Sequence, residues 1–305
     1  MKNIKIGSSQ LQGSQLALGC MRMVSKTVEE AQEVIQTAFD NGITLYDHAD
    51  IYGAGKSEQR FTQALKQTSI RRNEIILQSK VGIRKGFFDF SKEHIINATN
   101  GILERLETEY LDILLLHRPD TLFEPEEVAE AFEELFISGK VRYFGVSNQN
   151  PSQIQLLQNA LPRPLIINQL QFGPAHTPMI DAGFNVNMSD DLGINRDGGI
   201  LEYCRLNNIT IQPWSPFQVT LSEGLFMNHP DYQEMTAKLD EIAEKNNVSL
   251  EAAVIAWINR HPANMQTIIG SMSTDRIEKI VKAFDFQFTK EEWYEVYRSG
   301  GRPLP

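Results

Sequence analysis

The sequence has few cysteines and no long apolar run. Its two cysteines, Cys20 and Cys204, lie far apart among 305 residues and cannot build a disulfide framework. Both fall in apolar segments, so we interpret them as small buried side chains. No segment approaches the roughly 18 uninterrupted apolar residues of a membrane-spanning helix, and Met1–Lys5 lacks the apolar core of a signal peptide. We therefore expect a cytoplasmic protein that does not contact a membrane.

Positive charge and metal ligands are also scarce. The net charge is -10, and no basic run is longer than Arg71-Arg72. Nucleic acid is therefore not expected as a partner, because binding a phosphate backbone requires clustered Lys and Arg. The six histidines are scattered and form neither an HExxH motif nor a Cys/His cluster, so no metal site is expected.

Glycine-rich nucleotide motifs are missing as well. The segment Gly53-Ala54-Gly55-Lys56-Ser57 resembles the end of a P-loop, but Asp50 stands where the earlier glycine is required. No G-x-G-x-x-G follows a strand. We expect Lys56 to start a helix capped by Ser57, and any nucleotide to bind without a Rossmann fold.

Eight short apolar runs alternate with amphipathic, helix-like stretches. The runs are continuous, as in parallel strands buried on both faces. They are Leu16–Met21, Leu45–Asp50, Ile75–Val81, Leu111–His117, Val141–Ser147, Ile166–Phe172, Ile209–Trp214 and Gln266–Gly270. Helices are expected from Thr27 to Asn41, after Ser91, from Pro125 to Ser138, and over Pro151–Ala160, Gly199–Asn207, Asp231–Asn246 and Thr274–Phe284.

The count of eight strands and helices predicts a (β/α)8 TIM barrel in one domain spanning residues 1–305, although an open doubly wound sheet would give the same alternation. Lys2–Ile6 and Gln10–Gln12 predict an N-terminal hairpin that plugs one mouth. Extra C-terminal helices, Leu250–Asn259 and Lys290–Tyr297, are expected outside the repeat. Gly173–Gly198 has no periodicity and is interpreted as a long loop.

Polar residues end three consecutive strands, where barrel enzymes place their active sites. They are Asp47, Lys80 and His117, and Tyr52 follows the first of them. A lysine ammonium beside a phenol stabilises the phenolate and should lower the pKa of Tyr52 from its ordinary value near ~10. Asp47 would keep Lys80 charged and aimed, while His117 would donate a hydrogen bond to a substrate oxygen or relay its proton. This set suits an acid acting on a carbonyl oxygen during hydride transfer.

These residues resemble the catalytic tetrad of the aldo-keto reductase family. The resemblance runs from Leu16 to about Phe284 and is closest to a bacterial branch with His-Ala-Asp-Ile-Tyr-Gly and Leu-His-Arg-Pro-Asp segments. It implies a small-molecule aldehyde or ketone substrate. It also implies Tyr52 as general acid, Lys80 and Asp47 tuning it, and His117 orienting the carbonyl.

The same resemblance implies NADPH as cofactor, with NADH as the alternative. Ser147, Asn148 and Gln169 match the residues that hold the nicotinamide carboxamide. Trp214, followed by Ser215, Pro216 and Phe217, matches the aromatic segment that stacks on the ring. Gly270, Ser271, Ser273 and Arg276 match the phosphate segment, with Arg276 on the 2′-phosphate.

The sequence departs from the family pattern at several positions. Gly270 replaces a common lysine, and Lys279-Ile280 replaces the Glu-Asn pair that reads adenine. His48 replaces a small residue and should alter the pocket wall, and Gln149 replaces an aromatic. The loops carrying Met21–Met23, Phe87-Phe88 and Gly173–Gly198 are expected to line the pocket.

Two other functions stay open. Lys80 could form a Schiff base in a hydrolase or lyase, although Asp47 would hold it charged. A binding or regulatory subunit could keep the cofactor and turn over little. The physiological substrate and the oligomeric state are not encoded in any motif.

Overall fold

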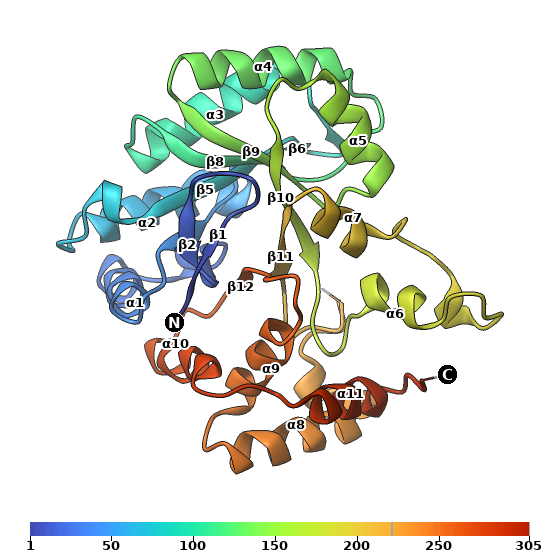
Figure 1. The fold of residues 1–305 in the computed structure, drawn as a ribbon. Coiled ribbons are helices and arrows are strands. Elements are labelled where there is room, and N and C mark those ends of the chain that lie inside the picture. The colour runs from blue at the N-terminus through green and yellow to red at the C-terminus, as the bar shows by residue number, and fades with distance from the viewer. Residues whose placement is uncertain (221, 305) are drawn as a thin grey trace.

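A computed structural model describes residues 1–220 and 222–304 and shows a barrel of eight parallel strands surrounded by helices (Figure 1). The strands are β3 (Leu16–Gly19), β4 (Leu45–Asp47), β5 (Ile76–Val81), β8 (Leu111–Leu116), β9 (Val141–Ser147), β10 (Leu165–Gln171), β11 (Thr210–Trp214) and β12 (Thr267–Ile269). They pair in the order β11-β10-β9-β8-β5-β4-β3-β12. At the seam between β11 and β12, the two ends of this order, the Gln266 amide donates to the Ile211 carbonyl at 3.0 Å. The prediction of a (β/α)8 barrel is confirmed.

The helices cover the outside of the barrel (Figure 1). Thr27 caps the first of them, as predicted: its hydroxyl accepts from the Glu30 amide at 3.2 Å, and the Glu30 carboxylate accepts from the Thr27 amide at 2.9 Å. The helices are α1 (Val28–Asp40), α2 (Lys56–Leu65), α3 (Lys92–Leu106), α4 (Pro125–Ile137), α5 (Pro151–Ala160), α6 (Pro178–Phe184), α7 (Ile200–Leu206), α8 (Gln233–Lys245), α9 (Leu250–Asn259), α10 (Thr274–Ile280) and α11 (Lys290–Ser299). None of the helices within the described ranges is long and apolar enough to span a membrane.

The N-terminal hairpin closes one mouth of the barrel. Its strands are β1 (Asn3–Lys5) and β2 (Gln12–Ser14), so the second strand begins two residues later than predicted. Ile6 is fully buried among inward-facing apolar side chains of the strands. The Gly7 amide donates to the Thr210 hydroxyl at 2.7 Å and ties the turn to β11. The opposite mouth, at the carboxyl ends of the strands, stays available for a ligand.

Helices α8 and α9 pack differently from the sequence-based prediction: α9, and not α8, covers the barrel. Residues 252–258 of α9 are all buried, and α9 contacts β12, so α9 is the helix that covers the seam. Helix α8 contacts α9 and α11 and lies farther from the strands than α9 does (Figure 1). The interpretation of Asp231–Asn246 as the repeat helix is therefore wrong. Its amphipathic pattern is real, but its apolar face packs on helices.

Helices α9 and α11 are joined by two stacked indoles. The Trp257 and Trp293 rings lie 4.7 Å apart with an interplanar angle of 2°. Each indole N–H donates to the backbone carbonyl of the other residue, at 3.0 and 2.9 Å. Because both indole donors are satisfied in the interior, the pair fixes the register of the two helices.

The long segment 173–198 contains more structure than its sequence indicated. It holds α6 and a 3-10 turn at Asp191–Gly193. Helix α6 spans seven residues, too few to show a 3.6-residue period clearly. The segment is fixed to α11, because the Tyr297 hydroxyl donates to the Asp181 carboxylate at 2.9 Å.

Candidate active site

Asp47 and Lys80 form a buried ion pair at the open mouth. Asp47 ends β4, which pairs with β5 through Asp47 and Gln78, two residues before Lys80. The Lys80 ammonium donates to the two Asp47 oxygens at 2.8 and 2.7 Å and to the His48 carbonyl at 2.7 Å. Lys80 is 0% exposed and Asp47 2%. The charged groups are thus fixed in position as well as neutralised.

Tyr52 completes the predicted cluster. It begins a 3-10 turn, Tyr52–Gly55, whose next residues Gly53, Ala54 and Gly55 all have positive φ (58°, 55° and 86°). The turn brings the phenol back over the barrel mouth, where its oxygen accepts from Lys80 Nζ at 3.3 Å. The ring meets the His117 imidazole edge to face, with centroids 6.0 Å apart. The structure therefore brings all four residues together from three strand ends.

The predicted direction of the Tyr52 pKa shift is wrong. Burial raises the pKa of Tyr52 above its ordinary value, and the Lys80 ammonium only opposes that rise. For Lys80, burial acts to lower the pKa, but Asp47 and Tyr52 outweigh it and the pKa is raised. The sequence placed the ammonium correctly but could not give the degree of burial, which is the larger effect. At neutral pH the phenol is protonated and the lysine is charged.

His117 is held in its neutral form. Burial lowers its pKa to about 2, assisted by the charges of Lys80 and Arg118. Its Nδ1 has no hydrogen-bond partner among the described residues. A neutral imidazole has one N–H to donate, so His117 can donate a hydrogen bond to an oxygen but is not a proton reservoir near neutral pH.

A network of glutamines beneath Asp47 was not predicted. Gln78 donates to Asp47 Oδ1 at 2.6 Å and exchanges hydrogen bonds with Gln212 at 2.8 and 3.0 Å. Gln212 also accepts from Gln169 at 3.0 Å and donates to Gln266 at 2.8 Å. These amides satisfy one another inside the barrel and hold the carboxylate. Their sequence signal is one Gln in each of three apolar runs and two, Gln169 and Gln171, in the run Ile166–Phe172.

The residues matched to the nicotinamide carboxamide lie beside the tetrad. Gln169 donates to Asp47 Oδ1 at 3.1 Å. The Asn148 amide donates to the Ser147 hydroxyl at 2.7 Å and accepts from the Trp214 indole at 3.2 Å. Asn148 and Ser215 have φ values of 57° and 49°, a left-handed conformation that costs energy in non-glycine residues and is frequent at functional sites.

The turn after β11 is well anchored. The Gln218 amide donates to the Ser215 carbonyl at 3.1 Å, and Phe226 donates to Phe217 at 3.0 Å. A Cβ on Gly173 would lie 2.3 Å from the Pro216 carbonyl, so glycine is required for this approach. Ser215, Pro216 and Phe217 therefore form a fixed edge beside Trp214.

The segment matched to the phosphates follows β12. Ser273 caps α10 by accepting from the Arg276 amide at 3.3 Å, and its own amide donates to the Ser271 hydroxyl at 3.3 Å. The Arg276 side chain is 56% exposed and lies 3.5 Å from Glu251. Arg22, which the sequence suggested only as part of a pocket loop and not for the phosphate segment, donates to the Gly270 carbonyl at 2.8 and 3.2 Å. Its signal was only its position just after β3.

Two residues have roles that differ from the predictions. His48 is fully buried on the outer side of β4, where its ring meets Phe61 at 4.6 Å, so it is not part of the pocket wall. It points outward because successive residues on a strand face opposite sides and Asp47 faces in. Ser57 does not cap α2: Gly55 holds that position, and the Ser57 hydroxyl donates to the Met21 carbonyl at 2.9 Å.

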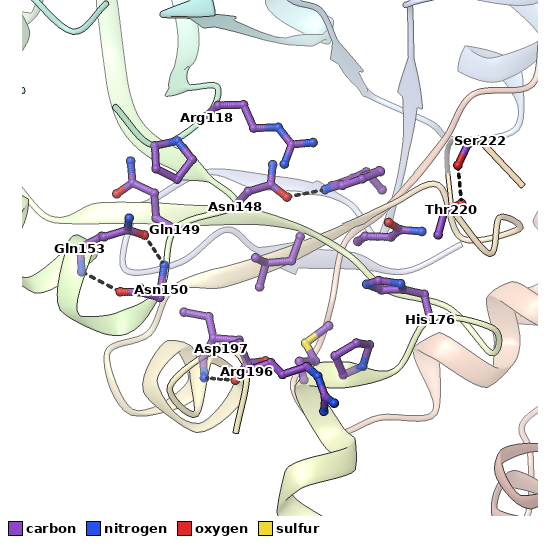
Figure 2. A pocket seen from close by; sticks show the side chains of 17 residues that line it. Arg118, Asn148, Gln149, Asn150, Gln153, His176, Arg196, Asp197, Thr220 and Ser222 are labelled. Carbon is purple, nitrogen blue, oxygen red and sulfur yellow. Dashed lines mark hydrogen bonds between the residues drawn. The ribbon is translucent and has the colours of Figure 1, made fainter. Parts of the chain in front are cut away.

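A cavity of about 850 Å³ opens beside Trp214 and Asn148 (Figure 2). The segment 173–198 lines it, as expected, through His176, Met179 and Arg196, and Gln149 contributes to the wall. Met21–Met23 and Phe87-Phe88 do not line this cavity. Phe87 and Phe88 form strand β7 and are exposed.

Comparison with known proteins agrees with this geometry. The model of the aldo/keto reductase family matches residues 4–299. The chain is 33% identical to oxidoreductase YdhF of Escherichia coli, covering 98% of this chain and 97% of that protein. It is also 33% identical to the uncharacterized oxidoreductase YcsN of Bacillus subtilis, covering 97% of each.

The fold is shared with a solved structure. A thermostable aldo-keto reductase crystallised with the inhibitor epalrestat superposes with a TM-score of 0.80 at 24% identity, covering 98% of this chain and all of that one. The family model matches nearly the whole chain, and the chain is 33% identical to an oxidoreductase over 98% of its length. The chain belongs to the aldo/keto reductase family of NAD(P)H-dependent oxidoreductases.

Proposed function

We propose that this protein reduces aldehyde or ketone carbonyls to alcohols with NADPH, and that Tyr52 is the general acid. The observation that carries the proposal is the buried chain of contacts from Asp47 through Lys80 to the Tyr52 hydroxyl, beside a neutral His117. A carbonyl oxygen could accept hydrogen bonds from both the Tyr52 hydroxyl and the His117 imidazole, whose ring centroids lie 6.0 Å apart.

The residues at the mouth fit a nicotinamide. A carboxamide has both donors and acceptors, and Ser147, Asn148 and Gln169, which are linked by hydrogen bonds at Ser147, carry both kinds of group. The Trp214 ring provides a flat surface for stacking. The segment after β12 carries two serines, Ser271 and Ser273, and two nearby arginines, Arg22 and Arg276. These groups suit a phosphate, and Arg276 would select the 2′-phosphate.

The protein's own residues polarise the carbonyl oxygen and transfer a proton to it. A bound reduced nicotinamide would supply the hydride that reaches the carbonyl carbon. His117 donates a hydrogen bond to the carbonyl oxygen and polarises it. Tyr52, protonated at neutral pH, transfers its proton to that oxygen as the C=O bond becomes C–OH. Lys80, kept charged by Asp47, stabilises the resulting phenolate until solvent returns the proton.

Replacing Tyr52 tests the proposal. Tyr52→Phe should lower kcat by about 10²- to 10⁴-fold because the acid is lost, while NADPH affinity measured by calorimetry stays near that of the wild type. Lys80→Met should also lower kcat more than cofactor affinity. Wild-type turnover in Tyr52→Phe would contradict the assigned acid. If Lys80→Met failed only in cofactor binding, its tuning role would be misassigned.

Replacing Arg276 tests the cofactor preference. Arg276→Gln should weaken NADPH binding by about 10- to 100-fold and NADH binding little, because only NADPH carries the phosphate that a guanidinium would bind. Dissociation constants for both nucleotides give the answer. An equal loss for both would mean that Arg276 supports the fold of α10 and does not read the phosphate.

The Schiff-base alternative is less well supported. Lys80 has a raised pKa and a carboxylate at 2.7 Å, whereas an imine-forming lysine must be neutral. Borohydride trapping on a carbonyl substrate without nicotinamide should leave no covalent adduct. For the alternative of a non-catalytic binding subunit, NADPH oxidation in the presence of an aldehyde decides directly.

A further inference from the structure

The cavity beside Trp214 contains an arginine whose charge is not neutralised. Arg118 directly follows His117 and is partly buried in the cavity wall. It forms no ion pair or hydrogen bond with any residue in the described ranges, and its guanidinium carbon lies 5.6 Å from the centre of the Trp214 ring. Burial lowers the pKa of Arg118, yet a guanidinium stays charged in proteins. Burial without an ionic partner costs a charged group its hydration, so an anion that paired with this cation would be bound favourably.

The other charged groups of the cavity reinforce this charge. Arg196 enters the cavity from the side opposite Arg118 (Figure 2). Among the described residues, it donates only to the backbone carbonyls of Asp191 and Ile194. Asp197 is the acidic residue of the lining, and its Oδ1 already accepts from the Gly199 amide at 3.0 Å. The cavity is thus positive in a chain of net charge -10.

The place of Arg118 in the barrel separates it from the segment matched to the cofactor phosphates. Arg118 follows β8, and the cavity continues over the ends of β9 and β10. Gly270 to Arg276 follow β12, which pairs with β3, and Arg22 joins them there. In the strand order, β8 is separated from β12 by β5, β4 and β3. The Arg118 guanidinium therefore lies at the strand end that carries His117, away from the segment matched to the cofactor phosphates.

We propose that Arg118, assisted by Arg196, binds a carboxylate on the carbonyl compound, so that the substrates of this enzyme are oxo acids. The inference rests on the proposed carbonyl reduction and specifies its substrate class. A planar guanidinium binds a carboxylate through two parallel hydrogen bonds, which fixes both ends of the substrate: the carboxylate at Arg118 and the carbonyl at Tyr52 and His117. A neutral aldehyde of the same shape lacks the first anchor.

Matched pairs of aldehydes test the inference. The probes are 2-, 3- and 4-carboxybenzaldehyde and their methyl esters, reduced with saturating NADPH. The three isomers place the carboxylate at different distances from the carbonyl. At least one acid should have a kcat/KM about 10- to 100-fold above that of its ester, through KM. Arg118→Gln should abolish this ratio, Arg118→Lys should restore part of it, and Arg196→Gln should reduce it less.

A control variant and a binding measurement sharpen the test. Arg298→Gln removes an exposed arginine of α11 and should leave the acid-to-ester ratio unchanged. Benzoate, which has no reducible carbonyl, should inhibit ester reduction competitively in the wild type and at least 10-fold more weakly in Arg118→Gln.

Several results would overturn the inference. Equal use of acids and esters by the wild type would do so, as would a preference that survives in Arg118→Gln. A loss of NADPH affinity in that variant, with acids and esters affected equally, would assign Arg118 to the cofactor. If the wild type reduced esters but showed no acid preference, the reductase would stand and the substrate class would fall. If it reduced neither, both would fall.

Discussion

At the scale of single residues, burial determines which protonated forms the site contains. Burial lowers the pKa of His117 to about 2, so this imidazole is neutral wherever the protein is folded. His48, one position after Asp47, is neutral for the same reason, with a pKa lowered to about 3. The two imidazoles differ in surroundings: His117 faces the mouth, whereas both His48 nitrogens are buried without hydrogen-bond partners among the described residues. Only the first can act on a substrate.

The buried His48 should make the protein sensitive to acid. Its folded pKa of about 3 lies below the ordinary value of about 6.5, so the unfolded chain takes up the proton first. Above pH 6.5 both states are neutral at this position, and as the pH falls toward 3 the protein loses stability because only the unfolded chain binds the proton. By pH 5 the loss is about 2 kcal/mol. His48→Leu should remove that loss and leave stability at pH 7 unchanged or higher, since two unpaired polar atoms disappear.

Urea unfolding of wild type and His48→Leu at pH 7 and pH 5 measures this effect. The difference in unfolding free energy between the two pH values should shrink by about 2 kcal/mol in the variant. Identical pH dependence in the two proteins would mean that His48 titrates normally in the folded state.

The sequence was informative about single residues where polarity interrupts a strand. Asp47, Lys80 and His117 ended apolar runs and could be placed at the mouth. The inward-facing glutamines could not be recognised in the same way, because a single polar residue inside a strand does not reveal which face it occupies. The direction of the Tyr52 pKa was mispredicted because burial is a property of the assembled barrel.

At the scale of elements, the turn that carries Tyr52 is held from outside the barrel. A Cβ on Gly55, whose φ is 86°, would lie 2.6 Å from Arg105 Cδ. Arg105 in turn donates to the buried Glu58 at 2.6 Å, and Glu58 accepts from Ser79 at 3.0 Å, next to Lys80. The turn, α3 and β5 are therefore connected through one ion pair.

A pair of glycine variants separates this contact from backbone strain. Gly55→Ala should destabilise the protein by about 3 kcal/mol and lower kcat, because it combines a left-handed backbone with displacement of Arg105. Gly86→Ala is the control: its φ is 90°, but no atom lies within 4 Å of the added Cβ. It should cost only about 1 to 2 kcal/mol and leave kcat unchanged. Thermal unfolding and steady-state kinetics are measured on both variants. Equal effects would show that displacement of Arg105 adds nothing to the backbone strain.

Among the elements, the strands were the most predictable. All eight predicted strands occur, because each continuous apolar run is longer than the error in its predicted bounds. Helices α8 and α9 were both predicted, but α8 was wrongly assigned to the barrel in place of α9. An amphipathic pattern shows that one helix face is buried, but it does not show which element covers that face. Helix α6 escaped notice because it is short and interrupted by irregular neighbours.

At the scale of the whole molecule, the C-terminal tail fixes the wall of the cavity. Arg302 is buried and donates to the Thr177 hydroxyl at 2.5 Å, to the Tyr297 carbonyl at 3.3 Å and to the Pro174 carbonyl. Pro174 and Thr177 flank His176, which lines the cavity. Residues more than 100 positions apart in the chain thus shape one wall of the proposed substrate site.

Removing this anchor should affect both stability and substrate binding. Arg302→Ala should cost about 3 kcal/mol, because several buried acceptors lose a charged donor, and should raise KM for the carbonyl substrate more than it lowers kcat. Urea unfolding and initial rates measure the two effects. Arg298→Ala, one turn earlier and exposed, is the control and should change neither. If Arg302→Ala kept the stability and the KM of the wild type, the C-terminal tail would not support the cavity wall.

The distribution of indoles has a spectroscopic consequence. Two of the three tryptophans form the stacked pair between α9 and α11, and the third, Trp214, stands at the mouth against Asn148. Under the proposed function, stacking of the oxidised nucleotide, which does not absorb indole emission, quenches Trp214 by contact and leaves the emission of the paired rings as an internal reference. Emission from a single unlabelled sample thus reports occupancy and structural integrity at the same time, through two separately placed sets of chromophores.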